Sequence, residues 1–525
     1  MLAARSSGRE PLLVGLAFAV AALPLLLVAH PPVGDLPDHL TRMWLLADGL
    51  ADPVLGAMWQ ADWSRASTNV AVDAVGVGLL RFLPLSIVSR LLTLALVLLP
   101  ALGGALLHRK LVGRTSAWSA IFVVTAFSTT AVAGFLSFQV GLGLGLLAAA
   151  GMHDRLRHGP TLATGALHLA MCALLLLVHP FGLLLYLAAA AAIVAGPAAP
   201  WRADGLTAGK IGWAAVLGLL ALAPVVLLFL AAPHPPGHAQ EMLWPALGYI
   251  LAPGRIVRTM ASPFITYDYR ADGVFLLLAG AAIVGALLSR GARVHGGTVL
   301  AATLLSLGAL AGPLGVGDAS WLQQRFAIMA ALLLFAAVEP GNGRPAWRRA
   351  VIALVLVAAL TRVAWIGLVW HDRDRDADDL LAVAGSLPRG ASVLVVQQET
   401  PEADQRLVGR YLQGGIGDPE RSQRHLPALL VPAARVFVPA LFTIPGQQPL
   451  AVRAAWRERS VETSAVPYPR VLDTADPRDP YVARPGAFDY LLLIGADEPT
   501  RAPLDPRGLA PIARRGFAAL YRIPR

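Results

Sequence analysis

Long apolar runs that recur along the chain leave few ways for it to fold. Of the 525 residues, 56% are hydrophobic and only 14% are charged, whereas roughly 25% are charged in soluble domains. A helix needs about 20 apolar residues to cross a membrane, and the runs predict an all-α polytopic membrane bundle of about 11 transmembrane helices. The runs are 11–30, 85–107, 116–134, 137–152, 161–178, 180–196, 211–232, 273–289, 298–314, 321–338 and 350–370.

The first run follows Arg5 and Arg9 and resembles a signal peptide. No small-residue cleavage site precedes His30, which stands before two prolines. We therefore expect an uncleaved first span, with the N-terminus in the cytoplasm.

Basic clusters between the runs set the orientation, because Lys and Arg concentrate in cytoplasmic loops. The segment 69–83 is also apolar, but it contains Asp73 and Arg81, and counting it as a span would invert everything after it. If it is an interfacial or re-entrant helix, every cluster becomes cytoplasmic. The clusters are 108–110 with Arg114, Arg155 with Arg157, Arg202 with Lys210, Arg290 with Arg293, and Arg344 with 348–349. These clusters account for much of the net charge of +10, so nucleic acid is not expected as a partner.

This topology places the longest connecting segments outside the cytoplasm. Residues 31–84 and 233–272 are outer loops of a transmembrane domain that covers residues 1–370. Residues 371–525 are richer in Arg, Asp and Pro, and they predict a small soluble α/β domain on the extracytoplasmic side. Within it we expect a charged linker at 371–376, a helix at 376–387, and strands at 392–396, 435–438, 490–494 and 517–523.

Carboxylates stand directly after the first span. The stretch 33–42 contains Asp35, Asp38 and His39, and it leads into an amphipathic segment, 40–50. At the outer membrane surface one carboxylate is enough to serve as a general base. The alternative is that Asp35 and Asp38 cap the helix that follows, which Asp does well.

Several short motifs resemble the GT-C fold integral membrane glycosyltransferases, a class that includes protein mannosyltransferases and aminoarabinose transferases. The likeness begins with the uncleaved span, residues 35–42 and 69–73, and the start of the next span at 84–91, and it is strongest to one uncharacterised bacterial group. Further motifs expected of that group are 135–138, 324–326 and 442–448. Asp35 matches the acid that this class carries in its first outer loop. The class often has Glu directly after that acid, whereas this chain has Leu36. Asp38 offers a second carboxylate three residues after Asp35.

The resemblance implies an enzyme of the cell inner (plasma) membrane. It would move a sugar from a polyprenyl-phosphate donor to an extracytoplasmic glycan, lipid or protein acceptor, in contact with membrane lipid. Asp35 would be the general base, with Asp38 as the second catalytic candidate. No cofactor is expected, and a divalent metal is an option for such an enzyme that the sequence does not support. His179, His234 and His238 could suggest a metal site together with Glu241, but His234 and His238 flank a Pro-Pro-Gly stretch without regular helical spacing, and proline disrupts a fixed geometry.

A lipid phosphate at the outer surface calls for cations, and the forked guanidinium of Arg suits it. Arg325 lies in a polar stretch that opens an apolar helix, and Arg255, Arg258 and Arg270 lie in the loop 233–272. Each is a candidate for substrate binding, and each could instead be an interface anchor. His39, beside Asp38, is grouped with these substrate-binding candidates, although its position fits an interface residue or a residue behind the site better than a direct ligand.

The alternative class of function is a lipid or solute transporter, or a non-catalytic membrane assembly protein. Transporters commonly show inverted repeats and charges within the membrane. The sequence shows no convincing internal repeat, and its polar residues gather between the runs. Arg362, inside the last run, requires a polar partner that the sequence does not identify.

Overall fold

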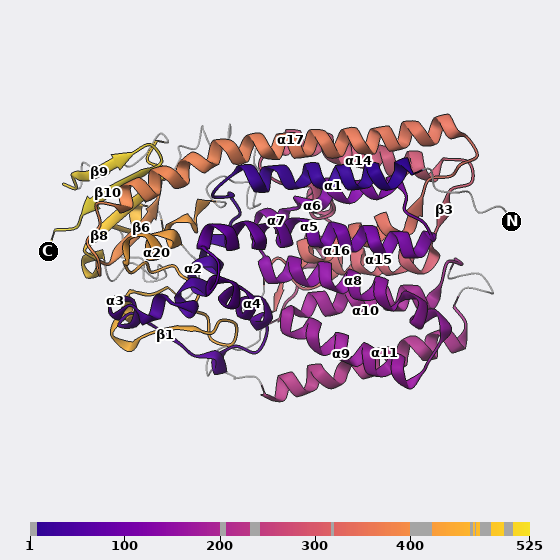
Figure 1. Cartoon of the computed structure of the whole chain (residues 1–525), viewed down its shortest axis with the longest axis horizontal. Helices are drawn as coiled ribbons and strands as arrows, with labels where there is room; N and C mark the ends of the chain where they lie inside the picture. Colours follow the sequence, from indigo (N-terminus) through magenta and orange to yellow (C-terminus); the bar gives the residue numbers. More distant parts are fainter. Residues whose placement is uncertain are drawn as a thin grey trace. The chain divides into compact units, whose positions relative to one another are not determined.

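The structure is a computed structural model of the chain (Figure 1). It describes residues 8–199, 206–231, 242–316, 320–398, 423–461, 466–467, 469–472, 485–497, 504 and 508–524. The chain divides into two compact units. Unit 1 comprises Met1–Leu26, Leu94–Ala131 and Ser137–Gly367, and unit 2 comprises Leu27–Thr93, Val132–Leu136 and Leu368–Arg525.

Most of the chain forms apolar helices. Among the described residues six are long and apolar enough to cross a membrane: α1 (Arg9–Leu27), α5 (Leu85–Val112), α8 (Leu136–His158), α11 (Ala208–Ala231), α14 (Tyr269–Leu287) and α17 (Pro345–Ala384). Shorter apolar helices are α4 (Val70–Leu80), the pair η3 and α6 (Ala117–Ala126), α9 (Leu162–Val178), α10 (Pro180–Ala195), α15 (Gly296–Ala311) and α16 (Leu322–Ala337). A multi-pass membrane protein is confirmed. The count of about 11 spans is not, because the remaining predicted runs form helices of 10–17 residues.

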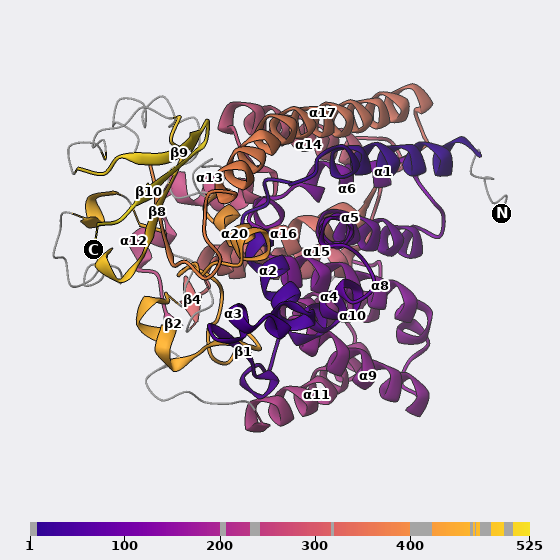
Figure 2. The same ribbon diagram turned by 60° about the vertical axis from the view of Figure 1, so that its left-hand side comes forward.

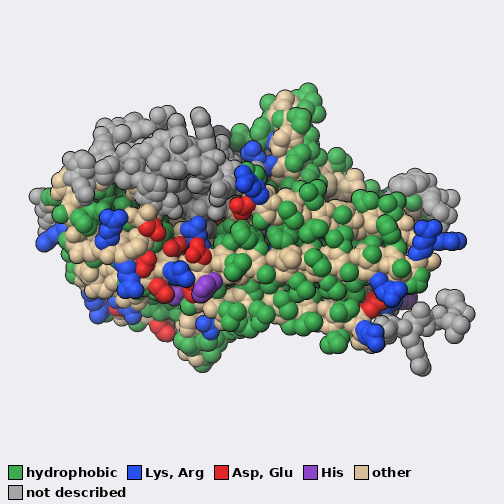
Figure 3. Space-filling view, turned by 90° about the horizontal axis from the view of Figure 1, so that it is seen from above, with side chains coloured by type: hydrophobic (Ala, Val, Ile, Leu, Met, Phe, Trp, Pro, Cys, Tyr) green, Lys and Arg blue, Asp and Glu red, His purple; other side chains and the backbone are tan. Residues whose placement is uncertain are grey.

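Large hydrophobic side chains are exposed on the outside of these helices. In α11 Leu219, Leu227 and Leu230 are 66%, 67% and 73% exposed. Figure 3 shows hydrophobic side chains spread over a broad area of the face that it presents. Continuous apolar surface of this kind is unfavourable in water and is suited to lipid.

The segment 69–83 forms α4, a helix of 11 residues. Such a helix is about 16 Å long, roughly half of the thickness of the hydrocarbon core of a bilayer. It is too short to cross a membrane as a helix. This length agrees with the orientation derived from the basic clusters, although the orientation itself stays a prediction.

Unit 2 contains a four-stranded sheet in the order β6-β8-β10-β9 (Figure 1). Its strands are β6 (Val393–Gln397), β8 (Tyr490–Ile494), β10 (Ala518–Arg522) and β9 (Pro511–Arg515). Figure 2 shows β8, β10 and β9 from another side. β6 and β8 are parallel and the other pairs are antiparallel. The strands predicted near 392–396, 490–494 and 517–523 are confirmed.

The strand predicted at 435–438 is wrong. Arg435 has a left-handed backbone, with φ of 58°, because it ends the short helix α20 (Leu430–Ala434). Pro439 follows and cannot donate a backbone hydrogen bond. Only Phe437 pairs, as an isolated bridge to Ser392.

The charged linker predicted at 371–376 is also wrong, since α17 continues unbroken to Ala384. Arg373 and Asp376 form an i,i+3 ion pair of 3.6 Å, a pairing that supports a helix. Alternating Arg and Asp therefore marks a solvated helix here rather than a loop.

The N-terminal and C-terminal parts of unit 2 share one hydrophobic core. β1 (Trp59–Ala61) pairs antiparallel with β7 (Leu450–Val452), and Trp59 stacks on Phe437 with ring centroids 5.1 Å apart. The helix α2 (Leu36–Ala47) packs on η6 (Leu426–Leu429), and Oγ1 of Thr41 donates to the carbonyl of Ala428. The remaining short α-helices and strands among the described residues are α3 (Pro53–Gly56), α7 (Thr129–Val132), α12 (Leu247–Ile250), α13 (Pro253–Ala261), β2 (Met242–Leu243), β3 (Arg293–Val294), β4 (Gly315–Val316) and β5 (Val338–Glu339).

Candidate functional site

The predicted acids lie at the start of α2. Pro37 stands in the first turn, where its missing N–H costs nothing. Asp35 is the N-cap residue, yet its side chain makes no capping hydrogen bond. Capping, the alternative role for Asp35, is therefore not what its carboxylate does.

The backbone around Asp35 is fixed by a turn between α7 and α8. The amides of Gly34 and Asp35 donate to the carbonyls of Val132 and Ala133, each at 2.8 Å. Gly134 has φ of +82°, and a Cβ on it would lie 2.4 Å from the amide nitrogen of Asp35. Only glycine fits at this approach, so the turn holds Asp35 in one place.

Both acids of α2 face His425, which precedes η6. Nδ1 of His425 lies 2.8 Å from Oδ2 of Asp38, and Nε2 lies 3.4 Å from Oδ1 of Asp35. The side chain of Asp38 is 1% exposed and that of His425 is 7% exposed, whereas that of Asp35 is 20% exposed. Of the two carboxylates, Asp35 is the one that an external molecule can reach.

A second buried pair lies one turn along the same helix. Nε and Nη2 of Arg42 donate to the two carboxylate oxygens of Asp73 in α4, at 3.2 Å and 2.8 Å. Nη2 also lies 2.8 Å from Nδ1 of His39. Because a guanidinium only donates, Nδ1 of His39 accepts, and its proton is on Nε2.

The electrostatic environment shifts the pKa values of His39 and His425 in opposite directions. Burial lowers the pKa of His39 well below its usual value, and the positive charges of Arg42 and His425 lower it further. Burial also acts to lower the pKa of His425, but the carboxylates of Asp38 and Asp35 outweigh it and raise the value overall. His39 is therefore neutral, and His425 favours the charged form.

The C-terminal chain covers both imidazoles with an aromatic ring. Phe442 lies 5.9 Å from His39 and 5.5 Å from His425, measured between ring centroids. Phe442 begins the stretch 442–448 that the sequence singled out. The structure thus brings this stretch to the acids, within unit 2.

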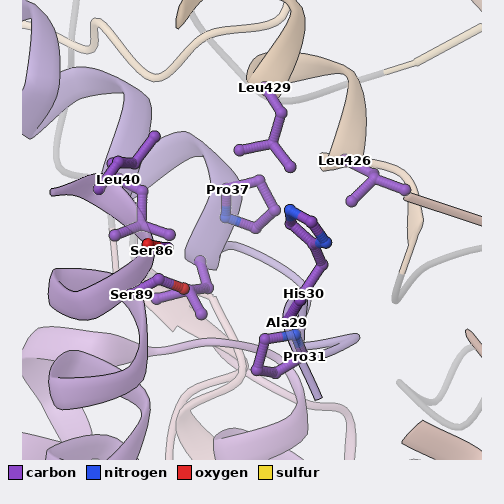
Figure 4. A pocket seen from close by; sticks show the side chains of 11 residues that line it. Ala29, His30, Pro31, Pro37, Leu40, Ser86, Ser89, Leu426 and Leu429 are labelled. Atoms are coloured by element: carbon purple, nitrogen blue, oxygen red, sulfur yellow. The ribbon is translucent and has the colours of Figure 1, made fainter. Parts of the chain in front are cut away.

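An apolar cavity of about 240 Å³ lies on another face of α2 (Figure 4). Leu36, Pro37 and Leu40 contribute to its wall, and with about 3.6 residues per turn they point away from Asp35 and Asp38. The other lining residues are Ala29, His30, Pro31, Leu85, Ser86, Ser89, Leu426 and Leu429. Its chemistry suits a hydrocarbon chain.

Arg325 lies in unit 1, near the start of α16. Its guanidinium carbon is 4.8 Å from the centre of the Phe138 ring, and Nη1 is 3.4 Å from Nε2 of His179. Nε donates to the carbonyl of Ser320. The face of an aromatic ring attracts a guanidinium, so this contact helps to hold the Arg325 side chain in place.

The other arginines named from the sequence also lie in unit 1. Arg255 in α13 is 9% exposed, and it donates to the carbonyls of Ala309 and Leu310 near the end of α15. This is a common way to satisfy a helix C-terminus. Arg258 and Arg270 are exposed, and Arg270 lies over the ring of Tyr269.

Arg362 has the polar partner that its place in a membrane helix required. It is fully buried in α17, and Nη1 donates to Oδ1 of Asp272 in α14 at 3.1 Å. Nη2 donates to the carbonyls of Phe127 and Phe264. The amide and hydroxyl of Thr266 donate to the same carboxylate, so this buried pair is well supplied with hydrogen bonds.

Sequence reasoning missed His425 as a site residue. It belongs to no recognisable motif and follows the acids by nearly 400 positions. The amphipathic pattern of α2 signalled only that its polar face needs partners.

Within the described residues no group of three or more His, Cys, Asp and Glu side chains is arranged to hold a metal ion. His234, His238 and Glu241 lie outside the described residues.

No protein-family model matches the sequence, and no curated protein matches it. Among solved structures, the crystal structure of ArnT from Cupriavidus metallidurans in the apo state aligns with 99% of this chain and 99% of its own chain. The aligned residues are 12% identical and the TM-score is 0.47. At this level of likeness, function has to be inferred from the chain's own residues.

Proposed function

We propose that this protein is an integral membrane glycosyltransferase of the GT-C class, and that Asp35 is its general base. The observation that carries the proposal is the state of Asp35. Its carboxylate heads a helix that it does not cap, its backbone is locked, and its side chain is partly exposed beside a buried histidine. Such a group is available to remove a proton from an acceptor hydroxyl.

The donor is proposed to be a sugar on a polyprenyl phosphate, and the acceptor an extracytoplasmic glycan, lipid or protein. Arg325 would bind the donor phosphate, with Arg255, Arg258 and Arg270 as further cationic candidates. His39 would help to hold the helix that bears the acids, through its contact with Arg42. The domain boundary at residue 370 and the extracytoplasmic C-terminal domain belong to the same proposal.

The test is turnover of the purified chain with a panel of polyprenyl-phosphate sugars. Asp35→Asn keeps the shape of the side chain but removes the base, so turnover should fall by on the order of 10²–10⁴-fold. Asp62→Asn is the matched control. Asp62 lies in the same loop and accepts a hydrogen bond from Ser64 as an N-cap, a role that Asn fills equally well.

Asp38→Asn separates the two carboxylates. Because Asp38 is buried, we expect Asp38→Asn to reduce turnover less than Asp35→Asn does. Full turnover in Asp35→Asn with loss in Asp38→Asn would reverse the assignment. Full turnover in both would remove the catalytic role of this motif, and no turnover of wild-type protein with any donor would favour the transporter or assembly alternatives.

A further inference from the structure

Burial raises the pKa of the Asp38 carboxyl, and the positive charges of His425 and Arg42 oppose this rise, so an ionised Asp38 depends on a counter-charge. With a side chain 1% exposed, it lacks the water that normally stabilises an ionised carboxylate, and an unpaired charge there is strongly unfavourable. Arg42 lies one turn further along α2, but its Nε and Nη2 are bonded to Asp73. The ion pair that Asp38 does make is with His425.

His425 is placed between two carboxylates, one at each ring nitrogen. The contact between His425 and Asp38 is an ion pair and not an aligned hydrogen bond, since Nδ1 of His425 and the oxygens of Asp38 make no hydrogen bond with the described residues. With both carboxylates ionised, a neutral imidazole would turn a lone pair toward one of them, whereas the positive charge of the imidazolium attracts both. We propose that His425 is protonated in the folded protein and bridges Asp35 and Asp38, so that it acts as a positioning residue for Asp35.

Other charged and titratable groups around the ring do not supply this bridge. His39 faces it from α2 and is neutral beside Arg42, and Arg424 precedes it in the chain and opposes its charge. The ring of Phe442, which follows later in the chain, packs against the ring of His425. The two carboxylates of α2 are the groups that favour the charged imidazole.

The consequence for the proposed reaction is specific. A base must be ionised before it accepts a proton, and a cation beside Asp35 favours the ionised form. It also fixes the direction of the carboxylate. This catalytic role rests on the proposed function, whereas the bridge itself does not.

The bridge makes stability depend on pH with a defined sign. The pKa of His425 is raised above 6.5 in the folded protein. Its stabilisation is therefore fully present below the pKa of the unfolded chain, about 6.5, and is lost as pH rises through the higher folded pKa.

The test is a thermal unfolding cycle on the full-length protein, with wild type, His425→Gln, Asp38→Asn and the double variant. At about pH 6 we expect His425→Gln to lower the melting temperature, and the difference from wild type to shrink by about pH 9. Adding Asp38→Asn to His425→Gln should restore part of the loss, because it removes the uncompensated charge. Losses that simply add, with no dependence on pH, would overturn the bridge.

His39→Gln is the control for the loss of an imidazole on the same cluster. Since His39 is neutral, its replacement should shift the melting temperature equally at both pH values. A pH-dependent shift in His39→Gln equal to that in His425→Gln would assign the titration to the cluster in general and overturn the proposal.

Turnover gives an independent reading. His425→Gln should reduce kcat by about 10²-fold, the cost of a displaced catalytic group, and should abolish the alkaline limb of the wild-type pH profile. If no donor is turned over while the unfolding cycle behaves as expected, the proposed function fails and the bridge stands. If turnover is present and His425→Gln leaves both kcat and the pH profile unchanged, the positioning role fails.

Discussion

Arg42 and Asp73 join α2 to α4 through two hydrogen bonds between side chains that are 3% and 1% exposed. The forked guanidinium matches the two carboxylate oxygens, and its Nη2 also contacts His39. The pair therefore fixes the helix that bears Asp35 and Asp38, and with it the geometry of the candidate site.

Removal of Arg42 should destabilise unit 2 severely. Arg42→Met leaves Asp73 buried without its partner, and breaking a buried pair in this way costs about 3–5 kcal/mol. Arg42→Lys should cost less but should not be neutral, because an ammonium cannot make the bidentate contact. Denaturant or thermal unfolding measures both.

Arg81→Lys is the matched control, since Arg81 is exposed at the end of α4. It should change stability by no more than about 0.5 kcal/mol. An Arg42→Lys variant as stable as Arg81→Lys would mean that charge alone, and not the fork, holds the two helices.

Gly134→Ala should disrupt the position of Asp35. The new Cβ would lie 2.4 Å from the amide nitrogen of Asp35 and 2.9 Å from that of Leu36, and backbone atoms cannot move aside cheaply. Gly113→Ala is the control: its φ of +83° is nearly the same, but nothing lies within 4 Å of the added Cβ. Gly113→Ala should lose only the roughly 1 kcal/mol of left-handed strain, so equal losses in thermal stability would contradict the close approach.

The sequence predicted the helices well, because apolar runs and turn residues are local signals. Every predicted run contains a helix, and three of the four predicted strands are present. Where prediction failed, local features near the segment decided the outcome. Arg373 pairs with Asp376 and continues α17, and Arg435 adopts a left-handed backbone that shortens the following extended segment.

The site could be predicted only in part, for a different reason. Asp35, Asp38 and His39 stand together in one stretch, and their spacing on α2 is readable from the sequence. His425 reaches them from the C-terminal chain, and Asp272 reaches Arg362 across 90 residues. Sequence alone shows that Arg362 and the acids need partners, since buried charges do, but the identity of those partners depends on tertiary packing.

Arg325→Ala should weaken binding of a lipid-linked donor. A hydrogen bond to a charged phosphate contributes about 1.5–3 kcal/mol, and the cation–π contact with Phe138 helps to hold the Arg325 guanidinium in place. Titration of the purified protein with a polyprenyl phosphate measures the loss. Arg325→Lys should recover part of it through charge alone, and unchanged affinity in Arg325→Ala would reduce Arg325 to an interface anchor.

The predicted orientation places the C-terminus outside the cytoplasm and the loop between α5 and η3, residues 113–116, inside. An alkaline phosphatase fused to the C-terminus should be active and a green fluorescent protein fused there should be dark. The same reporters inserted after residue 113 should give the opposite pattern. Reversal at both places would mean that α4 crosses the membrane despite its 11 residues.

Arg362 and Asp272 should behave as one unit when either is changed. Arg362→Met leaves Asp272 buried with only the two donors of Thr266, and Asp272→Asn leaves the guanidinium with uncharged acceptors. Each single variant should lose about 3–5 kcal/mol, the usual cost of a broken buried pair. The double variant should be more stable than the sum of the two losses predicts, by about 0.5–3 kcal/mol, because no uncompensated charge remains. It should not regain wild-type stability, since the carbonyls of Phe127 and Phe264 lose their donor.

Thr361→Ala, on the same turn of α17 but exposed, is the control and should change stability by no more than about 0.5 kcal/mol. Strictly additive losses in Arg362→Met and Asp272→Asn would show that the two charges are stabilised separately, and that the Arg362–Asp272 contact is not what permits an arginine inside this helix.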